Sequence, residues 1–284
     1  MTDQLTWQVG DIRITRVQEW EGAGLQMLVP NASVENLAPI DWVQPFVDHK
    51  GRATASMHTL AVEVDDQRIL IDTCAGNDKD RPMMPIWHMR TGPFLQELEE
   101  IGFGPDRVDT VVCTHLHTDH VGWNTRLVDD RWMPTFSRAR TLVAREEWDH
   151  WREEDADDMR QTLTDSVQPL FDADLVDLVE TNHQVADGVT MLPTPGHTPG
   201  HVAVLIESQG ESAVVTGDLV HHPIQFAHPD WRDIADSDGT QAEQTRRDFS
   251  TRFGDSPTLV IGTHFGGPTA GHLVRDGDAY RLDV

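Results

Sequence analysis

Short apolar runs separated by turn residues predict that much of the chain is β-structure. Two turns, Gly10-Asp11 and Asp65-Asp66, each lie between two such runs, which is the pattern of a β-hairpin. The expected strands cover residues 5–9, 12–17, 60–64, 69–71, 108–114, 189–192, 202–206, 213–216 and 258–261.

Three other segments have apolar residues at helical spacing. The expected helices cover residues 93–101, 145–171 and 241–253. Pro93 suits the first turn of a helix, and Gly102 is typical of the position just after a helix ends.

The order of these elements predicts an α/β fold. Strands are followed by helices, and then strands and a helix follow again. We therefore expect one domain over residues 1–284, made of two similar halves, roughly 1–180 and 181–284. The two halves are expected to pack sheet to sheet with their helices outside.

The charge of the chain is strongly negative. Its 284 residues include 22 Lys and Arg against 48 Asp and Glu, which gives a formal net charge of −26. This charge repels phosphate backbones and anionic membrane surfaces, so neither nucleic acid nor a membrane is an expected partner. Residues 1–10 lack a basic region followed by an apolar stretch, and no apolar run approaches the roughly 18 residues that span a bilayer, so a cytoplasmic location is expected.

The clearest chemical signal directly follows the strand expected at residues 108–114. It is the sequence His115-Leu-His117-Thr-Asp119-His120. Side chains two positions apart on an extended segment point the same way, so His115 and His117 can share one metal ion. The next turn can then aim Asp119 and His120 at a second ion. An isolated histidine more often bonds a carbonyl group or water, but this concentration of histidine and aspartate favours metal binding.

Further candidate ligands lie at the ends of later apolar runs. His197, Asp218 and His264 each follow such a run. Asp218 has two carboxylate oxygens, so it can bridge two ions. The expected ligands are therefore His115, His117 and His197 for one ion, Asp119, His120 and His264 for the other, and Asp218 for both.

The order of these ligands resembles that of the metallo-β-lactamase superfamily. It reads His-X-His-X-Asp-His, then His, then Asp, then His, over nearly the whole chain. The resemblance implies a four-layer αββα sandwich of the metallo-β-lactamase type. It also implies that Asp72 supports the ligands without binding metal itself, and His201 is expected to do the same.

Some members of that superfamily differ from this chain at the ligand positions. The main β-lactamase subclass has Arg in place of His120 and commonly Cys in place of Asp218, which argues against antibiotic hydrolysis. Redox members with a di-iron centre have Glu in place of His117. The nitrogen ligands of His115 and His117 favour two Zn²⁺ ions and hydrolysis, with cobalt, manganese or iron as alternatives.

Two local sequences, residues 115–123 and 194–201, look like those of quorum-quenching acyl-homoserine lactonases. Those enzymes have a tyrosine three residues after the bridging aspartate, where this chain has His221. Residues 217–225 are instead similar to the methyl parathion hydrolase branch, which also contains lactonases. The resemblance implies a broader lactone or ester substrate, with His221 either a catalytic hydrogen-bond donor or an ordinary surface histidine.

The expected reaction is hydrolysis at a carbonyl carbon by a metal-bound hydroxide, because zinc lowers the pKa of bound water. Asp119 or Asp218 is expected to hydrogen-bond the hydroxide, and Asp119 or His221 to protonate the leaving group. Two alternatives stay open. One is an organophosphate (phosphotriester) hydrolase or arylesterase with the same ligands, and the other is a non-catalytic metal-binding module or sensor.

The segment at residues 81–90 has no regular pattern. It is too irregular for a strand and too apolar for an ordinary surface loop. Together with Trp123 it is expected to line an apolar substrate pocket, to be buried in the core, or to form the contact of a homodimer.

Overall fold

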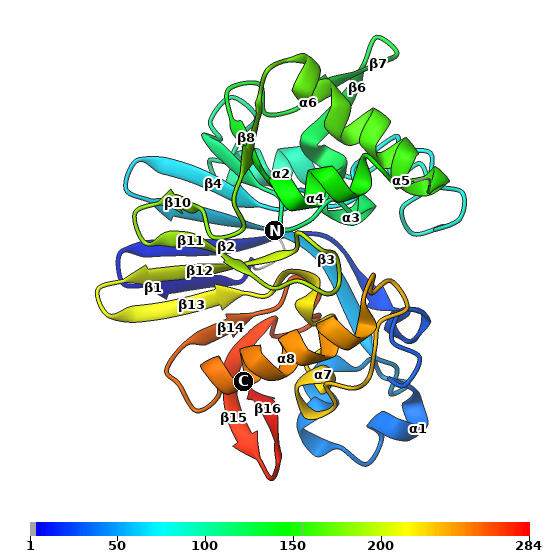
Figure 1. Cartoon of the computed structure of the whole chain (residues 1–284), viewed down its shortest axis with the longest axis vertical. Coiled ribbons are helices and arrows are strands. Elements are labelled where there is room, and N and C mark those ends of the chain that lie inside the picture. The colour runs from blue at the N-terminus through cyan, green and yellow to red at the C-terminus, as the bar shows by residue number, and fades with distance from the viewer. Residues whose placement is uncertain (1–3, 155) are drawn as a thin grey trace. The chain divides into compact units, whose positions relative to one another are not determined.

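The computed structural model describes residues 4–154 and 156–284, which fall into two compact units (Figure 1). The first unit consists of Met1–Glu19 and Met57–Glu180, and the second of Trp20–Ser56 and Thr181–Val284. The second unit thus takes an early segment of the chain in addition to the C-terminal part. The single-domain organisation over residues 1–284 stays a prediction.

Seven of the described strands form a mixed sheet, most of which belongs to the first unit. Its order is β1-β2-β3-β4-β5-β8-β9. β1 and β2 pair antiparallel, as do β3 and β4, whereas β4, β5, β8 and β9 run parallel to one another. The strands are β1 (Thr6–Val9), β2 (Ile12–Ala23), β3 (Thr54–Val64), β4 (Gln67–Ile71), β5 (Thr110–Val112), β8 (Arg140–Ala144) and β9 (Val176–Val179).

Helices of the first unit pack on this sheet through a hydrophobic cluster. Phe94 and Leu98 lie four residues apart on one face of α2, and both are buried in the same cluster as Val111 and Val143 of the sheet. The remaining elements of this unit are α2 (Phe94–Glu100), α3 (Thr118–Val121), η3 (Gly122–Asn124), the hairpin β6 (Thr125–Val128) and β7 (Arg131–Pro134), α4 (Arg145–Trp151), α5 (Asp157–Thr162), η4 (Leu163–Val167) and α6 (Gln168–Asp172).

The second unit contains another sheet of seven described strands, in the order β10-β11-β12-β13-β14-β15-β16. Its neighbours are antiparallel except for β13 and β14, which are parallel. The strands are β10 (Gln184–Ala186), β11 (Val189–Pro193), β12 (Val202–Ser208), β13 (Glu211–Val215), β14 (Leu259–Ile261), β15 (Ala270–Asp276) and β16 (Ala279–Asp283).

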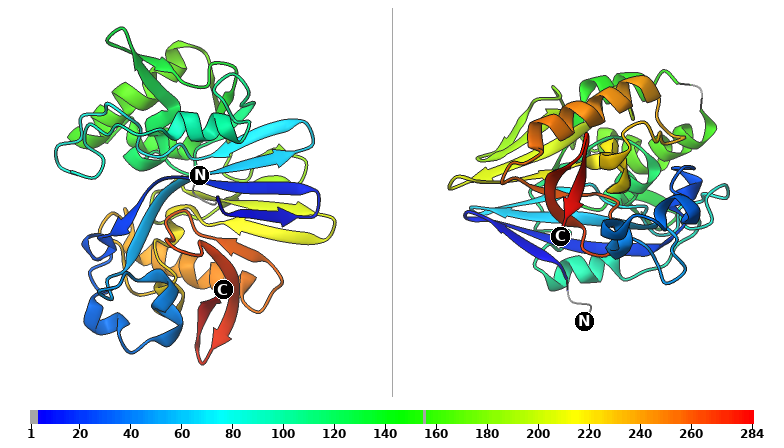
Figure 2. Two further views of the ribbon diagram at one scale, coloured as in Figure 1. Left: turned by 180° about the vertical axis from the view of Figure 1, so that it is seen from behind. Right: turned by 90° about the horizontal axis from the view of Figure 1, so that it is seen from below.

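Helix α8 lies against this second sheet (Figure 2). It begins after Asp238, whose side chain accepts hydrogen bonds from two backbone N–H groups of the first turn. Phe249 and Phe253 of α8 are buried together with Val214 and Leu282 of the sheet. The helices of this unit are η1 (Leu25–Met27), α1 (Val34–Leu37), η2 (Asp41–Phe46), η5 (Gly217–Leu219), α7 (Ile224–Ala227) and α8 (Gly239–Phe253). Among the helices that the structure describes in either unit, none is both long and apolar enough to cross a membrane.

The helix expected at residues 145–171 is divided in the structure into α4, α5, the π-helical turn η4 and α6, and one position of the expected helix, residue 155, lies outside the described residues. Asp157 and Asp158 occupy the first turn of α5, where negative charge favours the start of a new helix. Pro169 has no N–H to donate to the carbonyl of Asp165, so the regular α-helical hydrogen bond cannot form there. A single long helix was therefore the wrong prediction.

The carbonyl of Asp165 is bonded instead by a buried lysine. Lys79 Nζ lies 3.0 Å from this carbonyl and 2.6 Å from Thr125 Oγ1. The two terminal nitrogens of Arg81 each donate to the Asp165 carboxylate at 2.7 Å. Burial lowers the pKa of Lys79 to about 7, although the Asp165 carboxylate opposes this shift. These contacts attach the start of the 81–90 segment to the helical region of the first unit.

The middle of the 81–90 segment is exposed. Met83, Ile86 and Met89 have 85%, 40% and 51% of their surface accessible, so the expectation that the segment is buried in the core was wrong. Trp123 does lie in the core of the first unit. Its ring stacks on Phe94 at 5.5 Å between centroids, and its Nε1–H donates to Glu19 at 2.7 Å. A substrate contact or a dimer contact for the exposed residues stays a prediction.

The pKa of Lys79 predicts how stability changes with pH. The unfolded chain binds the Lys79 proton with the ordinary pKa of 10.5, and the folded chain with a pKa of about 7. Between these two pKa values the unfolded chain binds more of the Lys79 proton than the folded chain does, so a rise in pH stabilises the folded state. The unfolding free energy of the wild type minus that of Lys79→Met should increase by up to about 1.4 kcal/mol per pH unit on the alkaline side of this lower value.

Urea unfolding at a series of pH values measures this difference. Lys50→Met is the control, because Lys50 is exposed. A difference between the wild type and Lys79→Met that stays constant with pH would contradict a lowered pKa for Lys79.

Candidate metal centre

The predicted ligands of the first unit lie on the loop that follows β5. The loop backbone is held by two buried carboxylates: Asp72 accepts from the N–H of Thr114 at 2.8 Å, and Glu147 accepts from the N–H of Leu116 at 3.0 Å. His117 then occupies the position just before α3. These two bonds hold the backbone of the loop in its observed position.

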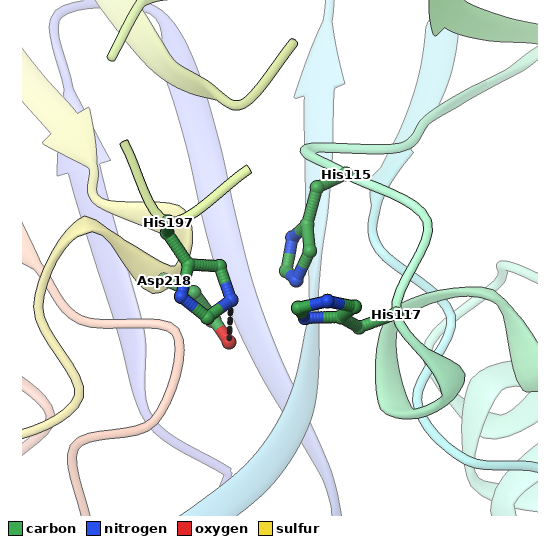
Figure 3. Close-up of side chains that lie close together, drawn as sticks. All are labelled: His115, His117, His197 and Asp218. Carbon is green, nitrogen blue, oxygen red and sulfur yellow. Dashed lines mark ion pairs between the residues drawn. The ribbon is translucent and has the colours of Figure 1, made fainter. Parts of the chain in front are cut away.

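The histidine rings on this loop are close to one another. The ring centroids of His115 and His117 are 4.6 Å apart (Figure 3), and those of His115 and His120 are 4.1 Å apart. His115 and His120 are fully buried. Asp119 lies in the first turn of α3, with a carboxylate oxygen 3.8 Å from Nε2 of His120. The structure thus brings together these predicted ligands of the first unit.

Asp72 fixes the orientation of two of these rings. Its Oδ2 lies 2.8 Å from Nδ1 of His120 and accepts from the hydroxyl of Thr114 at 2.8 Å. The same hydroxyl lies 3.1 Å from Nδ1 of His115. A histidine whose Nδ1 carries the shared proton has its lone pair on Nε2, which is the form that ligates a metal.

The segment around Asp72 approaches the metal-ligand loop closely. The N–H of Thr73 donates to the carbonyl of His120 at 2.7 Å, and a Cβ on Gly122 would lie only 1.8 Å from the carbonyl oxygen of Ala75. Only glycine fits at position 122. Asp72 itself has a φ of 58°, an unusual value for a residue with a side chain. Such strain is typical of a site whose geometry is imposed by its surroundings.

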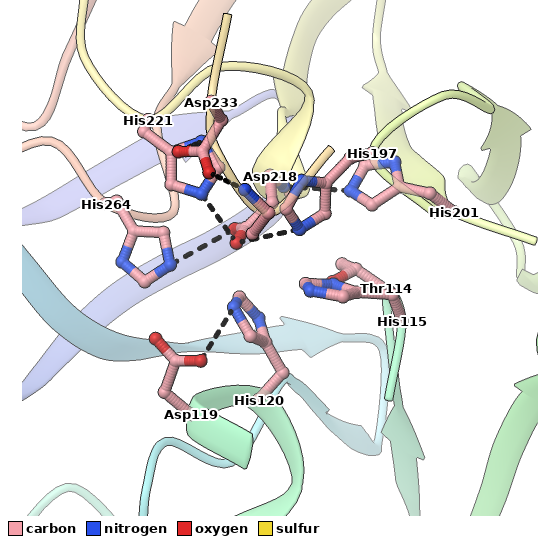
Figure 4. Close-up of polar contacts among 12 residues, drawn as sticks. Thr114, His115, Asp119, His120, His197, His201, Asp218, His221, Asp233 and His264 are labelled. Atoms are coloured by element: carbon pink, nitrogen blue, oxygen red, sulfur yellow. Dashed lines mark hydrogen bonds and ion pairs between the residues drawn. The ribbon is translucent and has the colours of Figure 1, made fainter. Parts of the chain in front are cut away.

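In the second unit, the carboxylate of Asp218 is the centre of the arrangement (Figure 4). Nε2 of His221 lies 3.0 Å from one of its oxygens, Nε2 of His264 lies 3.1 Å from the other, and Nε2 of His197 is 3.5 Å away. Potential ligand atoms of Asp218, His221 and His264 all lie within 4.8 Å of one another. The predicted ligands of this unit are thus also brought together, and His221 lies among them.

Each of these histidines also has an oxygen atom within 3.3 Å of Nδ1, in a hydrogen bond for His264 and His197 and in an ion pair for His221. His264 Nδ1 lies 2.8 Å from the carbonyl oxygen of Ser56. His197 Nδ1 lies 3.2 Å from Asp236, and His221 Nδ1 lies 3.3 Å from Asp233. Sequence reasoning did not find Asp233 or Asp236, because the acidic segment that contains them has no distinctive spacing. His221, which is 2% exposed, is not the surface histidine that was the alternative interpretation.

His201 has a supporting contact rather than a place among these ligands. Its Nε2 accepts from the backbone N–H of Asp218 at 2.8 Å, and its Nδ1 lies 2.8 Å from Thr194 Oγ1. Gly217 makes this contact possible. It has a φ of 55°, and a Cβ there would lie 2.5 Å from His201 Nε2.

The adjacent residues His221 and His222 have opposite pKa shifts. Burial alone would lower the pKa of His221, but the carboxylates of Asp233 and Asp218 outweigh burial and raise it to about 9. Burial lowers the pKa of His222 to about 4, although the carbonyl of Phe46, 3.1 Å from its Nε2, opposes this shift. For Asp236, burial would raise the pKa, but the hydrogen bond with His197 and the charge of Arg246 lower it.

Most of the chain matches a known protein family. Residues 58–264 match the model of the metallo-beta-lactamase superfamily. The chain belongs to the metallo-beta-lactamase superfamily. This membership confirms the resemblance inferred from the ligand order, and residues 58–264 include all the predicted metal ligands.

Relatives of known sequence within this superfamily are lactonases and other hydrolases. An N-acyl homoserine lactonase of Bacillus sp is 30% identical over 118 residues, which are 42% of this chain and 40% of that protein. A probable metallo-hydrolase of Mycobacterium tuberculosis is 26% identical over 188 residues, or 58% of this chain and 57% of that protein. The chain therefore matches less than two thirds of the length of these relatives. Their names agree with the expectation of a metal-dependent hydrolase.

Solved structures confirm the fold. The dizinc quorum-quenching lactonase AidC has a TM-score of 0.80 at 21% identity, covering 99% of this chain and 96% of that one. The hydrolase AbOPH has a TM-score of 0.79 at 24% identity, covering 98% and 96%. The expected α/β fold, the αββα sandwich of the metallo-β-lactamase type, is thus the fold of this chain.

The donor groups of both units fit divalent transition metals. Imidazole nitrogen and carboxylate oxygen are ligands that zinc, cobalt, manganese and iron share. Nδ1 of His115, His120, His197 and His264 is engaged by an outer partner, as is usual for a histidine that binds metal through Nε2. Both units therefore offer a histidine and aspartate cluster suited to metal.

Asp72 provides a test of this interpretation in the first unit. Asp72→Asn leaves one acceptor oxygen where the carboxylate has two, so the contacts to Thr114 and His120 cannot all be kept. We expect zinc affinity, measured by competition with a chelator, to fall about 10- to 100-fold. Asp66→Asn, in the exposed turn between β3 and β4, is the control. Unchanged affinity in Asp72→Asn would mean that Asp72 does not orient a metal ligand.

Proposed function

We propose that the chain is a dinuclear metal-dependent hydrolase that opens a lactone or cleaves an ester. The observation that carries this proposal is the buried carboxylate of Asp218, which is 3% exposed and has three imidazole Nε2 atoms around it. A buried carboxylate needs a positive partner, and imidazoles held at Nδ1 are arranged to share a cation with it.

The proposed ions are two Zn²⁺. His115, His117 and His197 would hold one ion, and Asp119, His120 and His264 would hold the other, with Asp218 shared by both. When bound, such ions make water available as hydroxide near neutral pH and polarise a carbonyl oxygen. The donor groups also suit cobalt, manganese or iron, so zinc is the preferred member of that set.

Two side chains of the chain itself would act on protons. The carboxylate of Asp119 would accept a hydrogen bond from the attacking water and could return the proton to the leaving oxygen. His221 would donate a hydrogen bond from Nε2 to the substrate carbonyl oxygen, and so stabilise the negative charge that develops there. The position of His221 beside Asp218 supports this role, because a donor must be near the ligands to reach the same substrate.

The proposed substrate is a small lactone or ester without phosphate. The net charge of −26 disfavours polyanions such as nucleic acid. Several relatives are named as N-acyl homoserine lactonases, which supports a lactone. His221 in place of the tyrosine expected for acyl-homoserine lactonases favours a wider range of lactones and esters. A phosphotriester hydrolase or arylesterase is the second candidate, supported by the similarity of residues 217–225 to the methyl parathion hydrolase branch.

Hydrolysis rates of the zinc-loaded protein across a panel of substrates distinguish these candidates. The panel contains γ- and δ-lactones, aryl esters, thioesters and paraoxon-like phosphotriesters. We expect the highest kcat/KM for a lactone or carboxylic ester, and Asp218→Ala should lose both bound zinc and activity. Faster turnover of the phosphotriester would support the second candidate. No turnover with two zinc ions bound would contradict an enzyme and favour a metal-binding module or sensor.

His221→Ala tests the proposed hydrogen-bond donor. Because a positioned donor contributes on the order of 10²-fold, kcat should fall by about this factor. Bound zinc, measured by elemental analysis, should remain as in the wild type. Activity within about twofold of the wild type would exclude His221 from the reaction.

A further inference from the structure

One short segment of the second unit, Asp233–Asp236, contacts two different histidines of the candidate centre. Asp233 Oδ2 lies 3.3 Å from Nδ1 of His221, and Asp236 Oδ1 lies 3.2 Å from Nδ1 of His197. The side chains of both aspartates are almost wholly buried, at 0% and 1% exposure. Asp233 lies near Nδ1 of His221, whereas Asp218 lies near its Nε2 (Figure 4).

The burial pattern of this segment is the reverse of the usual one. The aspartates are buried, whereas Ile234 between them is 68% exposed. Exposing isoleucine and burying carboxylates both cost stability. A segment that does both must be held by specific contacts, and such contacts are more often found where a site requires them.

The segment is held by its own hydrogen bonds. Asp233 Oδ1 accepts from the N–H of Ala235 at 2.7 Å, and the N–H of Asp233 donates to Asp236 Oδ2 at 3.3 Å. Arg246 of α8, which is fully buried, also lies 3.3 Å from Asp236 Oδ2. The oxygen of each carboxylate that does not face a histidine is therefore used to fix the carboxylate in place.

The backbone next to this segment also binds the loop of His197. The N–H of Ser237 donates to the carbonyl of His197 at 2.9 Å, and the N–H of Asp238 donates to the carbonyl of Gly196 at 2.9 Å. His197 is thus held through its backbone and its ring by the same stretch of chain. No such backbone bond joins this stretch to His221 among the described contacts. The contact on this side of the His221 ring is the ion pair of Nδ1 with Asp233, at 3.3 Å.

We propose that Asp233 and Asp236 are positioning residues with separate tasks: Asp236 aims His197 at the metal, and Asp233 aims His221 at the substrate. The proposal rests on the proposed function, in which His197 is a ligand and His221 a catalytic donor. It predicts that two isosteric changes only three residues apart have different effects, one on metal affinity and the other on turnover.

Asp236→Asn should weaken zinc binding. A ligand that loses its outer carboxylate typically costs 10- to 100-fold in metal affinity, and we expect a loss in this range from chelator competition. Because the defect is in binding, excess zinc should restore most of the turnover. Asp230→Asn, which changes an exposed aspartate of the same acidic segment, should leave zinc affinity and turnover unchanged.

Asp233→Asn should leave zinc affinity within about twofold and lower kcat by about tenfold or more, with a smaller change in KM. A double-mutant cycle with His221→Ala tests whether Asp233 acts through that ring. If it does, adding Asp233→Asn to His221→Ala causes no further loss. Independent, multiplying losses would overturn the proposal, as would a fall in zinc affinity in Asp233→Asn equal to that in Asp236→Asn.

Histidine 1H–15N spectra of the zinc-loaded protein provide a readout that does not depend on activity. The Nδ1–H signal of His221, assigned by its loss in His221→Ala, should shift or disappear in Asp233→Asn and persist in Asp236→Asn. If the spectra and zinc affinities follow this pattern but no substrate is turned over, the positioning of the two rings stands and the proposed function fails. Unchanged histidine signals in Asp233→Asn would overturn the positioning role itself. Where an Asn variant does not fold, the corresponding Ser variant repeats the same comparison.

Discussion

The buried carboxylate of Asp218 is the group on which the candidate centre of the second unit depends. Removing a carboxylate from water costs several kcal/mol unless positive charge or hydrogen bonds replace the water. Here three imidazole rings lie near the carboxylate of Asp218. A fourth ring, that of His201, accepts a hydrogen bond from the backbone N–H of Asp218. The left-handed backbone at Gly217 is needed for that approach. The local conformation of the chain is thus dictated by the surroundings of one charged group.

A second constraint follows from the first, because an imidazole can share a cation only if its ring is held in one orientation. The hydrogen-bond partners at Nδ1 are a backbone carbonyl for His264 and carboxylates for His197 and His120. These partners come from segments far from the histidines in sequence. Long-range packing of each unit therefore decides how well its ligands are aimed, and a substitution outside the ligand set can change metal affinity.

The clustered histidines and aspartates are easier to find in the sequence than the aspartates that contact them from outside. His115 to His120 form one compact pattern after an apolar run, and chemistry at such a pattern can be inferred from spacing alone. Asp233 and Asp236 lie in an acidic segment like many others in this chain, and only the fold shows that they are buried. Strands and helices can also be predicted from nearby residues, because apolar side chains recur along each at a characteristic spacing. The 145–171 helix is divided because negative charge at Asp157 and Asp158 favours a new start, and because Pro169 removes the hydrogen bond to the carbonyl of Asp165.

His221 and His222 show why residue type alone does not determine chemistry. Both are buried, and they are neighbours in the chain. No carboxylate outweighs the effect of burial on His222, so burial favours its neutral ring, whereas His221 lies between two carboxylates, which favour its protonated ring. Two adjacent histidines that are equally buried therefore differ in their pKa because of the groups around each ring.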